Sequence, residues 1–465
     1  MTATLKPPTV RVPAASIPSQ RRLLTGWGRT APSAADVYRV DDAAQLDALL
    51  RAPHPRGLCV RGMGRSYGDA AQNAGGDVVQ ATGMRSLRAL DASTGRVTVD
   101  AGMSLDALMR LTLPHGWFVS VTPGTRFVSV GGAIACDVHG KNHHRDGSFC
   151  DHVVSFELHT PGAGRMTVTA EDDPEVFWAT AGGMGLTGIV SRATLQLTPV
   201  ETASISVDTE RARDLDDALD RMERRDHEYR YSVAWIDLLA GGGALGRSVL
   251  TRGDHARLDD LPRGGAALRP PTPPALAAPR WVPPALLGRH SVRVFNEGWY
   301  RKAPREERGR IESLASFFYP LDGVRGWNRL YGPQGLVQYQ LVVPFGAHDA
   351  LHRVVERLQA ARAPALLAVL KRFGEQRGVI SFPAPGWTLA LDLPARLPGL
   401  ARLFDELDEL VVAAGGRVYL AKDARLRPEL LETMYPRLDE WRAVRTRLDP
   451  ARVLRSDLDR RLGLT

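Results

Sequence analysis

The chain has 465 residues, 44% of them apolar and 24% charged, so it is long enough for two or three hydrophobic cores. Its formal net charge of +8 favours an anionic partner, but charge alone does not choose among phosphorylated ligands, nucleic acid and an acidic membrane surface. No window approaches the roughly 18 apolar residues of a membrane span, and no nucleic-acid-binding motif is present, so we expect neither a spanning helix nor a nucleic-acid partner.

The termini and the cysteines bear on the compartment. Residues 1–18 are rich in Pro, Thr and Ala, which predicts a disordered start, and they lack the apolar region of a cleaved secretion signal. Cys59, Cys136 and Cys150 have no CxxC spacing, and their odd number argues against a disulfide framework or a zinc site. We therefore expect a cytoplasmic or membrane-associated protein, with the periplasmic face left open.

The first half of the chain has an α+β pattern. Residues 35–50 alternate acidic and apolar side chains at helical spacing and predict a helix. A second helix is predicted at 105–113, and short strands are predicted at 57–60, 96–99, 153–159 and 189–197. The turns between them are rich in glycine, the residue used where backbone approaches a ligand closely. We assign residues 19–199 to a first domain.

The glycine-rich loops stop near residue 199, and residues 212–225 predict an amphipathic helix that opens a second domain, 200–415. Further strands are predicted at 336–345, 365–370, 378–382, 388–393 and 417–421, and further helices at 348–362 and 400–414. Residues 241–288 are rich in Gly, Pro and Arg and predict a mobile loop, which is either dispensable or a lid over a site. Residues 416–465 form a C-terminal segment.

Three segments carry the chemistry. The first, Val60–Asp69, follows a predicted strand and contains Gly62, Gly64 and Gly68. Closely spaced glycines let consecutive backbone N–H groups point into one concavity, which suits a pyrophosphate. The spacing matches neither the dinucleotide GxGxxG nor a P-loop, and a glycine cluster by itself is also typical of an ordinary turn.

The second segment, Thr122–His144, combines a Pro-Gly turn, the pair Gly131-Gly132 and a polar cluster that begins at His139. Its small residues allow a flat ring system to lie against the backbone. Adjacent histidines on a loop rarely converge on one ion, and no carboxylate spacing completes a known pattern, so we expect no metal. The third segment, Phe177–Val190, has four glycines within seven residues and suits either a ligand contact or a buried hairpin.

Together, in this order, the three segments resemble the FAD-binding domain of the vanillyl-alcohol oxidase superfamily. Met434–Trp441, with Arg445 and Leu448–Pro450, resembles the closing segment of its sugar and aldonolactone oxidases. The resemblance implies a two-domain α+β fold with a mixed-sheet substrate domain, in which the C-terminal segment returns to the flavin. It implies that FAD is bound by Arg61, Gly62, Met63, Gly64, Arg65, Ser66, Tyr67, Gly68, Asp69, Gly124, Thr125, Ser129, Val130, Gly131, Gly132, Cys136, Asp137, His139, Gly140, Ile189 and Tyr419.

Shorter strings narrow the resemblance to the family of decaprenylphosphoryl-β-D-ribose 2'-oxidases, from about Leu24 to the C-terminus. They are Thr25–Ser33, Arg65–Asp69, His139–His144, Tyr331–Pro333, Gln338–Gln340 and Ala421–Asp423. In that family FAD oxidises the ribose 2'-hydroxyl to a ketone, and a separate NADH-dependent reductase completes epimerisation to the arabinose donor of cell-wall arabinan. The resemblance implies a polyprenyl-phosphate-linked sugar, a keto-sugar reductase partner and peripheral contact with a membrane, for which residues 252–289 are a candidate.

Oxidation of an alcohol by a flavin needs a group that accepts the hydroxyl proton. By resemblance, Lys422 is the first choice, provided that burial or a neighbouring cation lowers its pKa. Tyr67 and His139 are the alternative catalytic residues. Without the resemblance, a lysine at position 422 is equally well explained as a surface charge.

The substrate is expected to contact several further residues. Gln338 and Gln340 alternate along one predicted strand, so both project to the same face and suit sugar hydroxyls, although a solvent-facing strand would show the same pattern. Lys141 and Lys371 suit a phosphate. The resemblance adds Phe373, Thr388 and Ala390 to the substrate pocket.

Two departures from relatives affect the expected chemistry. Arg65 stands where many superfamily members attach FAD to a histidine, and a guanidinium is a poor candidate for that bond, so we expect noncovalent FAD. Mycobacterial relatives carry asparagine and cysteine where this chain has Thr388 and Ala390, so the pocket should be slightly larger and inert to thiol-directed electrophiles. An FAD-dependent oxidase of a soluble alditol or aldonolactone, and a flavin-free protein that binds an anionic polymer, remain as alternatives.

Overall fold

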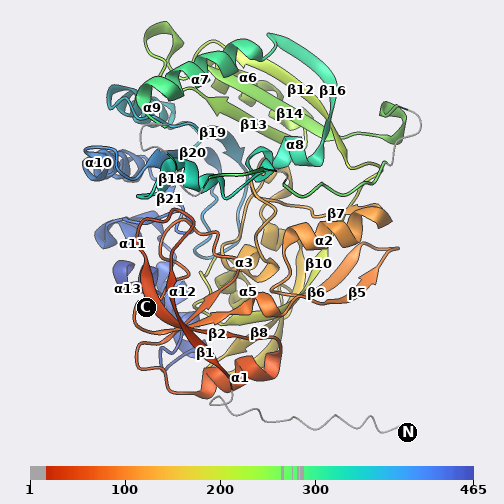
Figure 1. The fold of residues 1–465 in the computed structure, drawn as a ribbon, viewed down its shortest axis with the longest axis vertical. Helices are drawn as coiled ribbons and strands as arrows, with labels where there is room; N and C mark the ends of the chain where they lie inside the picture. Colours follow the sequence, from red (N-terminus) through yellow and green to blue (C-terminus); the bar gives the residue numbers. More distant parts are fainter. Residues whose placement is uncertain (1–16, 263–266, 275, 280–281, 283–286) are drawn as a thin grey trace.

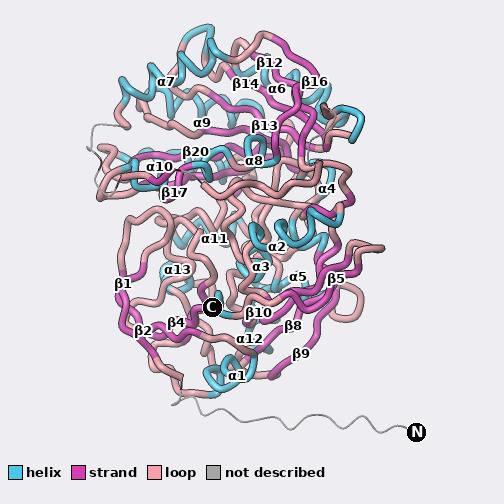
Figure 2. Tube along the Cα trace, turned by 45° about the vertical axis from the view of Figure 1, so that its right-hand side comes forward, coloured by secondary structure: helices cyan, strands magenta, loops and turns pink. Residues whose placement is uncertain are grey.

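The computed structural model describes residues 17–262, 267–274, 276–279, 282 and 287–465, which form two units that share one hydrophobic core (Figure 1). The lower unit in this view contains two main sheets, and the upper unit contains one large sheet. Figure 2 shows the same division from a second direction. The expected two-domain α+β class is confirmed. The predicted disorder of residues 1–18 lies outside the described residues as far as residue 16, and Ile17 is buried.

The lower unit holds the three glycine-bearing segments. Its first sheet has the order β1(Ser19–Leu24), β2(Ser33–Arg39), β4(Asp77–Gln80), β3(Leu58–Arg61), with β1 antiparallel and the others parallel. Its second sheet is antiparallel, in the order β5(Leu87–Asp91), β6(Arg96–Asp100), β10(Ile189–Gln196), β8(Val153–Thr160), β9(Gly164–Thr169). The helices of this unit are α1(Ala43–Arg51), α2(Leu105–Thr112), α3(Val130–Ala135), α4(His143–Asp146) and α5(Pro174–Thr180).

The predicted helix over residues 35–50 is wrong in its first half. Residues up to Arg39 belong to β2, which pairs with strands on both sides, and the helix α1 begins only at Ala43. The side chain of Asp42 accepts a hydrogen bond from the backbone N–H of Gln45 and caps α1. Strand pairing therefore overrode the local helical spacing.

The main sheet of the upper unit has eight strands and is wholly antiparallel, which differs from the mixed sheet expected in the substrate domain. The mixed sheet of this fold is the first sheet of the lower unit. The order of the eight strands is β16(Glu306–Ser313), β12(Ser204–Ala212), β14(Ser248–His255), β13(Tyr231–Ile236), β19(Ala368–Phe373), β20(Gly386–Pro394), β18(Leu336–Pro344), β21(Arg417–Val418). Residues 417–421 were predicted as a strand, but pairing ends at Val418.

Two further expectations for the upper unit are wrong. The predicted mobile loop 241–288 contains β14, which lies between β12 and β13 because its Val-Leu-Thr run is long enough to pair on both sides. Part of that loop lies outside the described residues. Residues 378–382 form no strand; instead, the N–H of Val379 bonds to the Trp178 carbonyl, and the Ser381 hydroxyl bonds to Asp137, which dock this segment on the lower unit.

The large sheet has two different faces because side chains alternate along each strand. Leu250, Ala234, Leu370, Leu389 and Leu341 are paired partners across five strands, and all are buried. They belong to the same core cluster as buried residues of α6(Leu215–Arg225), α9(His348–Ala360) and α10(Leu400–Ala413). The neighbouring row of residues therefore faces away from these helices.

The end of the chain returns to the lower unit, as the blue helices in Figure 1 show. Three helices at the end of the chain are α11(Leu431–Met434), α12(Leu438–Leu448) and α13(Asp457–Leu462). The remaining elements are β7(Trp117–Phe118), β11(Thr198–Pro199), β15(Leu276–Ala277), β17(Val324–Arg325), α7(Arg289–Lys302) and α8(Leu314–Phe318).

Hydrogen bonds attach the C-terminal segment to the lower unit. The N–H of Leu58 bonds to the carbonyl of Val453, and the carboxylate of Asp457 accepts from the N–H of Ala74. In the described part of the chain, no helix combines the length and apolarity that crossing a bilayer demands.

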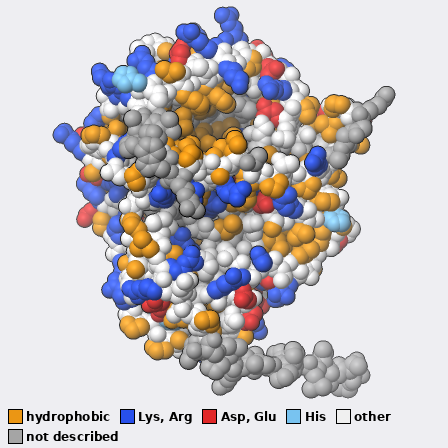
Figure 3. Space-filling view, in the orientation of Figure 1, with side chains coloured by type: hydrophobic (Ala, Val, Ile, Leu, Met, Phe, Trp, Pro, Cys, Tyr) orange, Lys and Arg blue, Asp and Glu red, His pale blue; other side chains and the backbone are white. Residues whose placement is uncertain are grey.

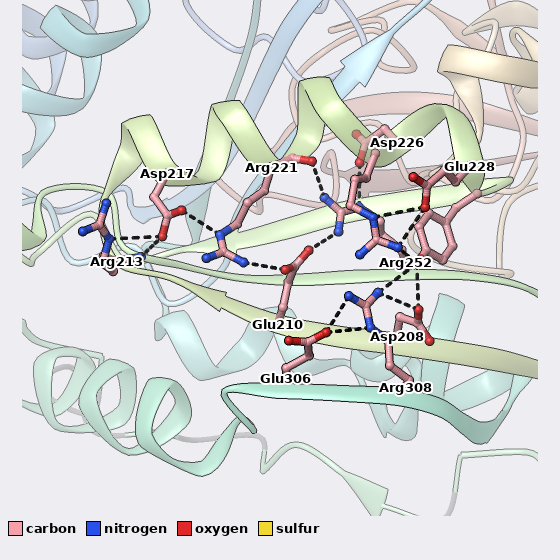
Figure 4. A network of polar contacts seen from close by, with 12 residues as sticks. Asp208, Glu210, Arg213, Asp217, Arg221, Asp226, Glu228, Arg252, Glu306 and Arg308 are labelled. Carbon is pink, nitrogen blue, oxygen red and sulfur yellow. Dashed lines mark hydrogen bonds and ion pairs between the residues drawn. The ribbon is translucent and has the colours of Figure 1, made fainter.

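A buried ion network fixes α6 to the edge of the large sheet (Figure 4). The guanidinium of Arg252 donates to Asp226 at 2.8 Å, to Glu210, and to the backbone carbonyl of Arg221 at 2.8 Å. Arg252, Glu210 and Asp226 are all buried. Each charge depends on its partners, because an unpaired charge in this position has no water to solvate it.

The network makes a stability prediction. Arg252→Met removes the ion-pair partner of buried Asp226 and one of the two guanidinium partners of buried Glu210, so we expect it to lower the free energy of unfolding by about 3–5 kcal/mol. The control is Arg224→Met on α6, the helix that the network holds. Its ion pair with Asp220 is exposed, so this variant should change the free energy of unfolding by less than about 0.5 kcal/mol. Urea unfolding of the three proteins measures both values. Equal midpoints for the two variants would contradict the assignment.

Candidate active site

A cavity of about 280 Å³ lies where the lower unit meets the large sheet. Its walls come from the loop after β3, the turn before α3 and α3 itself, the loop before β10, strands β18 to β20, and the segment after β21. All three glycine-bearing segments of the sequence therefore converge here. The predicted site residues that line the cavity are Gly62, Met63, Gly64, Arg65, Ser66, Tyr67, Gly124, Thr125, Ser129, Gly131, Gly132, Cys136, His139, Gln338, Gln340, Lys371, Ala390, Tyr419 and Lys422.

The loop after β3 offers unused donors to the cavity. Within the described structure, the backbone N–H groups of residues 62–66 donate to no other residue. Gly64 has φ of +63°, and a Cβ at this position would lie 2.3 Å from the Arg61 guanidinium. That guanidinium is itself held behind the loop by the carbonyls of Thr25 and Ala71. A run of free N–H groups against a cavity is an anion-binding arrangement.

The second segment supplies a surface of small residues. The Ser129 hydroxyl accepts from the N–H of Gly132 and caps α3, while the N–H groups of Val130 and Gly131 bond to carbonyls of the lower unit. The backbone N–H groups of these residues are therefore already hydrogen-bonded. This segment shapes the cavity wall but offers no free N–H groups to an anion. At Gly124 a Cβ would have no atom within 4 Å, so this glycine leaves room in the cavity.

The C-terminal segment completes the wall by direct backbone contact with the first loop. The N–H of Tyr67 bonds to the carbonyl of Ala421 at 3.0 Å. A Cβ on Gly68 would lie 1.9 Å from the carbonyl oxygen of Asp423, so only glycine permits this approach. The contact places the ammonium of Lys422 4.3 Å from the centre of the Tyr67 ring.

Lysines gather at this cavity although the chain otherwise uses arginine. The chain has five lysines among its 60 basic residues, and Lys371 lies within electrostatic reach of both Lys141 and Lys422. Burial, with the neighbouring lysines, lowers the pKa of Lys371 to about 7, and burial lowers that of Lys141 to about 8. Lys141 Nζ donates to the carbonyl of Phe317 at 2.5 Å. This concentration of positive charge favours an anionic ligand.

The three candidate proton acceptors differ in their availability. Burial raises the pKa of Tyr67 well above its usual value, so its hydroxyl stays protonated. Burial and the charge of Lys371 lower the pKa of His139, and its Nε2 lies 2.9 Å from the amide nitrogen of Gln340, from which it accepts. Burial lowers the pKa of Lys422 to about 8, so its neutral amine becomes available as the pH rises toward 8.

A carboxyl that was not predicted lies behind Lys422. Asp392 is completely buried, accepts from Gln338 Nε2 at 2.5 Å, and has a second oxygen without a partner among the described residues. Burial raises its pKa to about 7, while Gln338 and Lys422 oppose this. The alternation of Thr388, Ala390 and Asp392 along β20 is the signal that would have found it.

Several predicted residues do not line the cavity. They are Arg61, Gly68, Asp69, Val130, Asp137, Gly140, Lys141, Ile189, Phe373 and Thr388. Most of them support the wall from behind: Asp69 pairs with Arg461, Phe373 packs against the His139 ring, and Thr388 accepts from Gln340 at 3.3 Å. Val130 and Ile189 are core residues.

Aromatic and aliphatic side chains that were not predicted also line the cavity. They are Trp27, Val128, Met184, Leu321, Trp327, Leu367 and Val369, with smaller neighbours. The guanidinium of Arg65 lies 3.9 Å from the centre of the Trp27 ring, and its Nε donates to the carbonyl of Phe127. Trp27 belongs to the string Thr25–Ser33, which carries part of the family resemblance but predicts no role for this tryptophan.

Comparison with known proteins supports a flavin site at this cavity. Residues 34–170 match a family of FAD-binding domains, and residues 393–462 match the D-arabinono-1,4-lactone oxidase family. The chain is 43% identical to a decaprenylphosphoryl-β-D-ribose oxidase of Mycolicibacterium smegmatis, over 96% of this chain and 98% of that protein.

Two other relatives extend the comparison. An uncharacterised protein of Streptomyces coelicolor is 45% identical over 78% of this chain and its own full length. An L-gulono-1,4-lactone dehydrogenase of Mycobacterium tuberculosis is 25% identical over 93% of this chain and 96% of that protein. These matches indicate FAD as the cofactor. The free N–H groups of residues 62–66, which line the cavity, suit the pyrophosphate of FAD.

The open space at Gly124 makes a prediction about cofactor binding. Gly124→Leu places a branched side chain in the cavity, so we expect FAD affinity to fall about tenfold or more. Gly243→Leu is the matched control, because a Cβ there also meets no atom within 4 Å but the residue does not line the cavity. Flavin absorbance per chain and titration of the apoprotein measure the effect. Normal flavin content in the Gly124 variant would remove this residue from the cofactor site.

Proposed function

Because the chain belongs to the family of decaprenylphosphoryl-β-D-ribose oxidases, we propose that it oxidises the ribose 2'-hydroxyl of a polyprenyl-phosphoryl ribose, such as decaprenylphosphoryl-β-D-ribose, to the 2'-ketone. The observation that carries this proposal is the lysine cluster beside a loop of unused N–H groups. The loop suits the pyrophosphate of FAD, and the lysines suit a second anion on the substrate.

The cofactor site is assigned to the lower unit, residues 19–199. The N–H groups of residues 62–66 would hold the pyrophosphate, and the small residues Gly131 and Gly132 would leave room for the flat ring. The bound FAD supplies the acceptor for the hydride that leaves the carbinol carbon. It is held without a covalent bond, because Arg65 is stacked on Trp27 and is no nucleophile for such an attachment.

Lys422 is assigned as the group that takes the hydroxyl proton. Among the three candidate proton acceptors, its amine is the one that becomes neutral as the pH approaches 8, since Tyr67 stays protonated and Nε2 of His139 is occupied by Gln340. The charge of Asp392 stabilises the ammonium that forms when the proton arrives. Tyr67 and His139 then hold the sugar in place instead of moving its proton.

The substrate site is assigned to the upper unit, residues 200–415, with 416–465 closing the cavity. Lys371 pairs with the substrate phosphate, and Lys141 adds to the positive potential from behind the wall. Gln338 and Gln340 retain their amide oxygens for sugar hydroxyls, because their amide nitrogens already donate within the protein. Phe373 and Thr388 shape the pocket through His139 and Gln340.

The proposed reaction also sets the context of the protein. A keto sugar on a lipid phosphate requires a reductase to complete an epimerisation, and an NADH-dependent enzyme fits that role. The lipid substrate requires access to a membrane surface, and residues 252–289 are proposed as a peripheral contact. Part of that segment lies outside the described residues.

Anaerobic mixing tests the proposed substrate. We expect decaprenylphosphoryl ribose to bleach the visible absorbance of the flavin, whereas free alditols and aldonolactones leave it unchanged. Lys371→Met should raise the KM for the phosphoryl substrate about tenfold or more by removing one charge partner. Bleaching by a free alditol or aldonolactone, with none by the lipid-linked sugar, would instead favour the alternative that the lactone-oxidase match suggests.

The pH dependence of kcat tests Lys422. A base must be neutral to act, so kcat should rise with pH and level off above about 8, the pKa to which burial lowers Lys422. Asp392→Asn removes the negative charge that favours the ammonium, so the rise should move to lower pH by about one unit. Lys422→Met should lower kcat by about 10²–10⁴. Lys302→Met, at an exposed lysine, is the control. If the pH profile of kcat does not move in Asp392→Asn, Asp392 does not set the pKa of the catalytic base.

A further inference from the structure

A row of paired residues, apolar after Gln340, crosses the large sheet from the cavity outward. Gln340, Ala390, Val369, Trp235 and Val249 are successive pairing partners on β18, β20, β19, β13 and β14. Paired residues of antiparallel strands project to the same face, so these side chains form one line. The first three line the cavity, and the line continues past its wall with a tryptophan and a valine. The floor of the cavity is therefore continuous with half-buried Trp235 and buried Val249 on the same face of the sheet.

Helix α7 lies over the far end of this row and exposes aromatic side chains. The Trp235 ring lies 6.5 Å from the ring of Trp299, which stacks on Phe295 at 6.0 Å. Phe295 and Trp299 are each 43% exposed, and Val294 is 74% exposed. Figure 3 shows a hollow in the upper unit with hydrophobic side chains gathered in it.

The exposure is not explained by a loosely attached helix. Asn296 of α7 is buried and donates to Asp237 at 2.7 Å, and Glu297 pairs with Arg247 at 2.6 Å. Arg247 also bonds to Asp237, so the helix is fixed to the sheet by a connected polar network. Aromatic side chains held in water on an anchored helix indicate a surface that another apolar group covers.

We propose that the polyprenyl chain of the substrate leaves the cavity along the row Ala390, Val369 and Trp235 and is covered by Phe295 and Trp299 of α7. The inference rests on the proposed function, since the apolar occupant is the tail of the lipid-linked sugar. The phosphate stays with Lys371, which lies on the same strand as Val369, two residues away and on the same face. The phosphate would therefore lie beside Lys371, and the first part of the apolar tail would lie beside Val369, on the same strand.

A membrane surface is the competing occupant of α7. A bilayer would account for exposed aromatic side chains beside Arg293, but it would not require the apolar row that joins the cavity to Trp235. The continuity of this row favours the substrate tail. Two experiments distinguish the substrate tail from a membrane surface. One varies the length of the polyprenyl chain, and the other locates a photolabel carried by that chain.

The test compares geranyl-phosphoryl and decaprenyl-phosphoryl ribose as substrates of the flavin-loaded protein. The parent protein should show the lower KM for the long chain. The double variant Phe295→Ser/Trp299→Ser should raise KM for the long-chain substrate about tenfold and remove most of that preference. Leu23→Ser, at an apolar position on β1 that is 69% exposed, is the control. A preference that persists in the double variant overturns the proposal.

Photolabelling gives a readout that does not depend on turnover. A decaprenyl phosphate with a diazirine in its chain should label peptides that contain Trp235 or α7, and Phe295→Ser/Trp299→Ser should reduce that labelling. Labelling confined to other peptides overturns the path. Loss of binding to phosphatidylglycerol vesicles, with equal KM changes for both chain lengths, overturns it in favour of a membrane contact. If neither ribose substrate turns over, the proposed function fails, while the label still decides the path.

Discussion

The close backbone contact between the loop after β3 and the C-terminal segment is the constraint on which the site depends. Gly68 lets the carbonyl of Asp423 approach to a distance that any side chain would prevent, and the Tyr67 N–H bonds to Ala421. This contact closes the cavity with residues that lie about three quarters of the chain apart. It also fixes Lys422 beside Tyr67, so the proposed base stands on a rigid support.

Burial then gives the lysines their chemistry. A guanidinium keeps its charge near neutral pH, whereas an ammonium that loses water approaches neutrality. In a chain that relies on arginine elsewhere, Lys371 and Lys422 are buried cations that lose their protons more readily. In the proposed function, Lys371 pairs with the substrate phosphate and Lys422 takes the hydroxyl proton. The carboxyl of Asp392 modulates this balance from a position that does not line the cavity.

The alternation of the large sheet links the site to the core and to the surface. One face packs leucines against α6, α9 and α10, and the opposite face presents Gln340, Ala390 and Val369 to the cavity and Trp235 beyond it. A one-residue shift of register would exchange these faces, so packing of the core also fixes the site. The helix α7 is anchored on the cavity side of this sheet through Asn296.

The sequence by itself determined the α+β class, the order of the three glycine-bearing segments and most of the residues that converge on the cavity, because turns, glycines and strand alternation are local signals. It did not determine that residues 35–39 pair as a strand, that β14 lies inside a Gly- and Pro-rich stretch, or that Asp392 stands behind Lys422. Those features depend on partners distant in the chain, and only the tertiary structure decided them, since strand pairing and desolvation are properties of the folded assembly and not of a local segment.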